Sequence, residues 1–103
     1  MNILYVESDE KLINLINENC SESVNEIILL NNPKDALSLL KQTNNIDLII
    51  TEINFSTLDV IFYLKEIRKL KKDILIVITS KLDIYLSYKK FLDLNISAIL
   101  NKP

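Results

Sequence analysis

The chain has 103 residues, of which 49% are hydrophobic and 25% charged, and its net charge at pH 7 is −2. A chain of this length fits one small domain, so we expect residues 1–103 to fold as a single unit. The nearly balanced charge argues against a nucleic-acid-binding face, and no apolar run approaches the roughly 20 residues that span a bilayer.

Two residue types are missing altogether, histidine and glycine. Their absence removes the commonest general base and excludes glycine-rich phosphate-binding loops. Turns with positive φ must then use asparagine, which we expect at Asn31-Asn32, Asn44-Asn45 and Asn95. The single cysteine, Cys20, excludes an intrachain disulfide and favours a reducing compartment, so we expect a cytoplasmic protein.

Short apolar runs alternate along the chain with longer segments of helical periodicity. The continuous run Ile3–Val6 predicts a buried strand. A helix should follow Asp9, which can cap it, because apolar residues recur there at helical spacing, namely Leu12, Ile13, Ile16 and Cys20. Glu26–Leu30 predicts a second strand, and Pro33 suits the first turn of a second helix.

The second half of the chain repeats this alternation. Its predicted elements are a strand at Asp47–Ile53, a helix at Thr57–Leu70, a strand at Ile74–Thr79, a helix at Lys81–Leu94 and a strand at Ala98–Leu100. In the first of these helices Ile61, Leu64 and Ile67 should face inward, which leaves Phe62 exposed. Such alternation predicts a parallel sheet with helices on both faces, a three-layer α/β sandwich.

Polar side chains follow several of the predicted strands, at the edge where α/β sheets bind ligands. They are contributed by Glu7-Ser8-Asp9, Thr51-Glu52-Ile53-Asn54, Thr79-Ser80 and Asn101-Lys102. We therefore expect Lys102 to lie within salt-bridge reach of Glu52 or Glu7.

Five segments together resemble the receiver domain of response regulators in two-component signalling. Ile3–Glu10 resembles its first-strand acidic motif, and Asp47–Asn54 resembles the strand of the phosphoryl-accepting aspartate. Leu64–Arg68, Ile76–Ser80 and Leu100–Pro103 resemble its third helix, its hydroxyl-ended strand and its lysine–proline close. The resemblance implies a flavodoxin-like fold, with a five-stranded parallel sheet of order 2-1-3-4-5.

The resemblance also implies a chemistry. In the family, an aspartate at the position of Glu52 accepts a phosphoryl group from a histidine kinase, and Mg²⁺ neutralises the developing charge. The residues that would hold Mg²⁺ here are Glu7, Glu52 and Asn54. Phosphoryl oxygens would contact Thr79 and Lys102.

Three positions depart from the family pattern. Glu52 replaces the aspartate, which pushes the carboxylate about 1.5 Å further out, and a misplacement of about 1 Å can cost roughly 100-fold in rate. Ser8 replaces a metal-binding acid, although hard cations prefer carboxylate ligands. Ile99 stands at the switch position, where an aromatic side chain is usual. We therefore expect a receiver that acts through protein contacts without phosphorylation, with no cofactor or weakly held Mg²⁺.

The chain stops at Pro103, before the fifth helix of the family. We expect apolar side chains of the first, third and fifth strands to be left uncovered on one face, and we expect the protein to self-associate there. The expected partners are proteins, such as a histidine kinase or the output domain of the same regulator, and neither nucleic acid nor a membrane.

Several alternatives stay open. The domain could be a working Mg²⁺-dependent phosphoacceptor, or Glu52 could imitate the phosphorylated state by reaching Lys102 and Thr79. It could also be a pure dimerisation module, or a small α/β enzyme with Glu52 and Lys102 as acid–base partners, although it lacks a nucleophile elbow. Finally, Glu7, Glu52 and Lys102 could form a merely structural ion-pair cluster, with Thr79 bonded to backbone.

Overall fold

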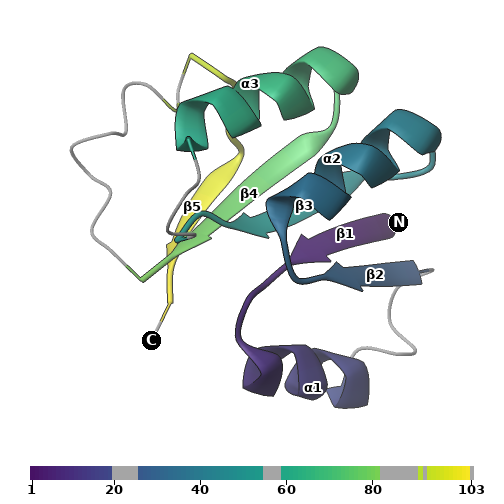
Figure 1. The fold of residues 1–103 in the computed structure, drawn as a ribbon, viewed down its shortest axis with the longest axis vertical. Coiled ribbons are helices and arrows are strands. Elements are labelled where there is room, and N and C mark those ends of the chain that lie inside the picture. The colour runs from purple at the N-terminus through teal and green to yellow at the C-terminus, as the bar shows by residue number, and fades with distance from the viewer. Residues whose placement is uncertain (20–25, 55–58, 82–90, 92, 103) are drawn as a thin grey trace.

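The computed structural model describes residues 1–19, 26–54, 59–81, 91 and 93–102. Its five strands form one parallel sheet of order β2-β1-β3-β4-β5 (Figure 1). The strands are β1 (Asn2–Val6), β2 (Glu26–Leu30), β3 (Leu48–Glu52), β4 (Leu75–Ser80) and β5 (Ala98–Asn101). The described helices are α1 (Glu10–Asn19), α2 (Pro33–Gln42) and α3 (Val60–Leu70). The three-layer α/β sandwich and the flavodoxin-like strand order predicted from the sequence are confirmed.

The predicted strand boundaries agree with the structure to within one residue. The start of α3 differs by more. It begins at Val60 and not at Thr57, because the Asp59 carboxylate accepts a hydrogen bond from the Phe62 backbone N–H at 3.0 Å and caps the helix there. The predicted helix at Lys81–Leu94 and the predicted core residue Cys20 lie mostly or wholly outside the described residues.

The asparagines meet the expectation of positive φ at one position. Asn95, in the turn before β5, has φ of 57°, in the left-handed region that asparagine tolerates better than most residues. The expectation is wrong for Asn31-Asn32 and Asn44-Asn45, since Asn95 is the one such residue in the described part of the chain. Asn32 instead has extended backbone and caps α2, where its side chain accepts from the Asp35 N–H at 2.9 Å.

The core lies between the sheet and the α2–α3 layer (Figure 1). Alternate strand residues point to this face, and Leu4, Ile49 and Ile76 form one cross-strand row of it. Helical residues complete the same buried cluster, among them Ala36, Leu40, Leu64 and Ile67. For α3, the apolar periodicity therefore identified Leu64 and Ile67 as core residues, whereas Ile61 is only partly buried.

The opposite face of the sheet is less well covered. On β4 and β5, Leu75 and Leu100 are 46% and 53% exposed, while the alternate residue Ile76 is fully buried. On β1, by contrast, Ile3 is buried. Of the three strands expected to be uncovered, only β5 has an exposed apolar side chain among the described residues, Leu100, while Ile3 of β1 is buried and Leu48 and Ile50 of β3 are half-buried.

Arg68 joins the end of α3 to the turn before β5. Its guanidinium group donates hydrogen bonds to five backbone carbonyl groups, at 2.8 to 3.3 Å, those of Lys71, Lys72, Ile74, Leu94 and Asn95. Arg68 and Lys69 lie in the last turn of α3, where positive charge interacts favourably with the helix dipole. The geometry adds that Arg68 satisfies carbonyl groups that neither helix nor strand uses.

Tyr63 links α3 to β3 within the core and was not predicted. Its side chain is 1% exposed, and its hydroxyl group lies 2.8 Å from Thr51 Oγ1. Thr51 Oγ1 also donates to the Glu52 carbonyl oxygen at 3.1 Å, and in its pair with Tyr63 either hydroxyl group can be the donor. Burial raises the pKa of Tyr63 to about 12, and the bond to Thr51 only partly opposes this.

This pKa predicts a loss of stability at alkaline pH. In the unfolded chain the phenol ionises near pH 10, but in the folded protein it stays neutral up to about pH 12, so stability falls between these values. The loss should reach about 2–3 kcal/mol. Urea unfolding between pH 8 and 11.5 should show a clearly smaller decline for Tyr63→Phe than for the wild type. Equal declines would show that Tyr63 is not the group responsible.

Candidate functional site

Three charged side chains meet at the carboxyl edge of the sheet. Glu7 directly follows β1, Glu52 ends β3, and Lys102 follows β5. The Lys102 ammonium nitrogen lies 2.6 Å from Glu7 Oε2 and 2.9 Å from Glu52 Oε1. The expected salt bridge is therefore present, and to both carboxylates.

Ser8 completes this cluster from the connection between β1 and α1. Its backbone N–H and its hydroxyl group both donate to Glu52 Oε2, at 2.9 and 2.5 Å. Glu52 thus uses one oxygen for Ser8 and the other for Lys102, and only 1% of the residue is exposed. Ser8 was expected only as the loss of an acid, whereas in the structure it donates to Glu52.

Glu7 is fully buried and less completely bonded. Its Oε2 accepts from Lys102 and, at 2.9 Å, from the Asp9 backbone N–H. Its Oε1 has no hydrogen-bond partner among the described residues. Two carboxylates and one ammonium group therefore share the cluster, and most of their charge is balanced by short, charge-assisted bonds.

The hydrogen bonds outweigh burial in setting the ionisation of the cluster. Burial alone would raise the pKa of Glu52, but the bonds from Ser8 and Lys102 hold that pKa below its ordinary value. Burial likewise opposes the charge on Lys102, but its bonds to Glu7 and Glu52 raise its pKa. The site therefore holds an ionised pair near neutral pH.

The other predicted positions lie around the cluster without joining it. Thr79 is buried, and its hydroxyl oxygen has no partner among the described residues, so neither the bond to backbone nor the contact with Glu52 is seen. The Asn54 amide group instead donates to Ser80 Oγ at 3.2 Å and accepts from the Lys81 N–H at 2.6 Å. Ile99, at the switch position, is half-buried and packs against the core.

This arrangement does not fit a Mg²⁺ centre. A hard cation needs several free oxygen ligands, and Mg²⁺ usually takes one or two carboxylates together with waters. Here the Lys102 ammonium group lies between the two carboxylates, and both Glu52 oxygens already accept bonds. The Asn54 side chain is also turned to Ser80 and Lys81. Among the described residues, no group of three or more acidic, histidine or cysteine side chains could hold a metal ion.

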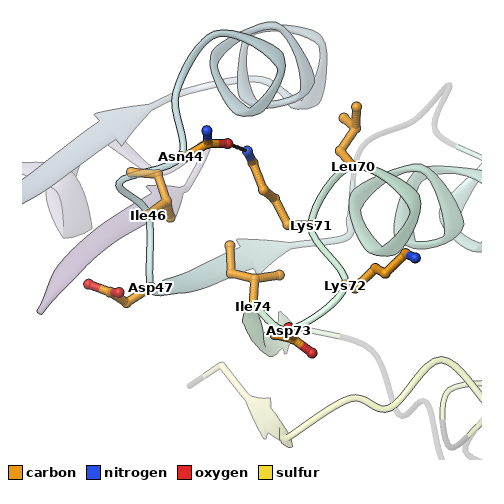
Figure 2. A pocket seen from close by; sticks show the side chains of 8 residues that line it. All are labelled: Asn44, Ile46, Asp47, Leu70, Lys71, Lys72, Asp73 and Ile74. Carbon is orange, nitrogen blue, oxygen red and sulfur yellow. Dashed lines mark hydrogen bonds between the residues drawn. The ribbon is translucent and has the colours of Figure 1, made fainter.

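A separate hollow lies at the opposite edge of the sheet, where β3 and β4 begin (Figure 2). It has a volume of about 360 Å³ and is lined by Asn44, Ile46, Asp47, Leu70, Lys71, Lys72, Asp73 and Ile74. Figure 2 shows the Lys71 ammonium group reaching the Asn44 side-chain oxygen across it. Its two lysines and two aspartates balance, and it lies away from the edge where parallel sheets bind ligands.

The fold and the charged cluster define a receiver-type signalling domain. Residues 3–103 match the family model of the response regulator receiver domain, and the chain belongs to this family. None of the described helices is long and apolar enough to cross a membrane. Comparison with curated protein sequences gave no match.

Solved structures share the fold. The response regulator TrrA from Thermotoga maritima, in complex with Mg²⁺-BeF, is 26% identical, with a TM-score of 0.80 over 99% of this chain and 86% of that one. A CheY-like receiver domain from Methanospirillum hungatei is 15% identical, with a TM-score of 0.85 over 99% and 81%. A protein described as an adenylate cyclase from Rhodopirellula baltica is 18% identical, with a TM-score of 0.85 over 99% and 76%.

Removing the lysine tests whether the cluster depends on it. Lys102→Met keeps an unbranched apolar side chain but leaves two buried carboxylates without their counter-charge, which typically costs about 3–5 kcal/mol. Urea unfolding at pH 7 should show a loss of this size. Lys65→Met, at an exposed position of α3, is the matched control and should change stability by less than about 0.5 kcal/mol. A loss no larger than that of the control would mean that the cluster contributes nothing.

Proposed function

We propose that residues 1–103 act as one receiver domain that transmits signals through protein–protein contacts without accepting a phosphoryl group. The observation that carries the proposal is the state of Glu52, the residue at the phosphoacceptor position. Its carboxylate is buried, and both of its oxygens are bonded, to Ser8 and to Lys102.

The geometry of phosphoryl transfer explains why these contacts matter. The attacking oxygen must be in line with the leaving group, and positive charge must screen the incoming phosphoryl group. At Glu52 the screening lysine is already bonded to the carboxylate itself and to Glu7. An incoming donor would first have to break these bonds and open a buried site.

The same contacts argue against an acid–base enzyme. Glu52 and Lys102 neutralise one another, and the pKa of Glu52 lies below its ordinary value, because the bonds from Ser8 and Lys102 outweigh its burial. A general acid needs a raised pKa and access to substrate. We therefore assign no catalytic activity and no cofactor. We place the domain in the cytoplasm, with a histidine kinase or an output domain of the same regulator as its partner.

A phosphodonor assay tests the proposal. After incubation with a small acyl phosphate and Mg²⁺, intact mass should show no adduct of about 80 Da, the mass of a phosphoryl group. The double variant Ser8→Asp, Glu52→Asp restores the acids that are usual in the family and serves as the positive control. A stoichiometric adduct on the wild-type protein, mapped to Glu52, would overturn the proposal.

Self-association through the uncovered sheet face is a second part of the proposal. Apart from Glu52, which is buried in the charged cluster, the alternate residues of β3, β4 and β5 on this face are uncharged: Leu48, Ile50, Leu75, Val77, Thr79, Ala98 and Leu100. Two copies can therefore meet there without like-charge repulsion, and a two-fold axis would place the same surface on both sides. Only Leu75 and Leu100 are strongly exposed there, so we expect a small interface, and interfaces that bury less than about 1,200 Å² are typically transient.

Two matched variants separate this face from the rest of the surface. Leu100→Lys should abolish association, because it places a charge in the apolar patch. Phe62→Lys changes a side chain that is 59% exposed on α3, and it should leave association unchanged. Light scattering from ten micromolar to one millimolar gives the mass. An interface at this face would be contradicted if the wild-type protein stayed monomeric at every concentration, or if both variants lost association equally.

A further inference from the structure

Two hydrogen-bond donors of Ser8 converge on one oxygen of Glu52. The backbone N–H lies 2.9 Å from Glu52 Oε2, and the hydroxyl group lies 2.5 Å from the same atom. The other oxygen, Oε1, is 2.9 Å from the Lys102 ammonium nitrogen. The glutamate side chain therefore spans from the end of β1, on one side of β3, to the end of β5, which lies beyond β4.

The length of the side chain decides whether this span is possible. Aspartate is shorter by one methylene group, which withdraws the carboxylate by about 1.5 Å. A contact of 2.9 Å would then exceed 3.5 Å on at least one side, beyond hydrogen-bond range. Lys102 can follow the shorter side chain, because its four-carbon stem is flexible. The Ser8 backbone N–H is fixed by the chain, so the bonds to Ser8 are the ones that aspartate loses.

We propose that Ser8 is a positioning residue that makes glutamate, and not aspartate, the residue required at position 52. Serine adds a hydroxyl donor to the backbone N–H that any residue at position 8 would have, where an acid would add a like charge, and glutamate supplies the reach to accept both bonds. The two departures from the family pattern are thus one coupled change, which closes the site with bonds between β1, β3 and β5. This inference deepens the proposed function, since it explains what keeps Glu52 bonded and buried.

A double-mutant cycle between positions 8 and 52 tests the coupling. The four proteins are wild type, Ser8→Ala, Glu52→Asp and the double variant, each unfolded in urea at pH 7. Hydrogen bonds to charged groups are strong, so Ser8→Ala should raise the unfolding equilibrium constant about tenfold to hundredfold when Glu52 is present. With aspartate at position 52, the same change should raise it less than about threefold. Equal effects in the two backgrounds would overturn the proposal.

Two controls separate positioning from general destabilisation. Ser8→Thr retains both donors and should be as stable as the wild type. A loss of stability equal to that of Ser8→Ala would count against the hydroxyl bond. Ser38→Ala, at an exposed position of α2, should change nothing. If a variant fails to fold, amide hydrogen exchange in the wild-type protein still tests the bond between the Ser8 N–H and Glu52. The Ser8 N–H should be protected although Ser8 is exposed, and free exchange would contradict its bond to Glu52.

The test distinguishes this inference from the function on which it rests. A phosphoryl adduct on the wild-type protein would disprove the proposed function, but it would not change the conclusion of the double-mutant cycle. Additive effects in the cycle would remove the role of Ser8, while the absence of an adduct would still support a domain that does not accept phosphate.

Discussion

One ammonium group shared between two buried carboxylates governs the carboxyl edge of this domain. Lys102 lies within 2.9 Å of both Glu7 and Glu52, and the glutamates are almost completely buried. Taking such charges out of water is costly, and an apolar cluster of the same volume would often be equally stable. The effect of the cluster is therefore mainly geometric. It fixes the ends of β1, β3 and β5 relative to one another.

The same bonds explain why the departures from the family pattern are compatible with a well-packed fold. Two acidic residues at one sheet edge would repel each other if they were left unscreened in a medium of low dielectric constant. Lys102 supplies the screening within the chain, and Ser8 and Asp9 add backbone N–H donors at the start of α1. A bound cation is not required for this balance.

The parallel sheet and the meeting of Glu7, Glu52 and Lys102 were predictable from simple rules, whereas the strand order was implied by the resemblance to the receiver family. Alternating apolar runs fix the parallel sheet, and parallel strands bring their carboxyl ends to one edge. The role of Ser8 was not predictable in the same way, because its donors act through distances that only the folded chain defines. Tyr63 and Arg68 were missed for a similar reason. Their bonds to Thr51 and to backbone carbonyl groups depend on tertiary packing and not on periodicity.

The two faces of the sheet differ in how well they are covered. The α2–α3 face holds the buried core, and Tyr63 links this core to the backbone of Glu52 through Thr51. The other face leaves Leu75 and Leu100 largely exposed near the strand that leads to Lys102. Leu100 lies on β5 two residues before Lys102, so the exposed apolar face and the charged cluster share this edge strand.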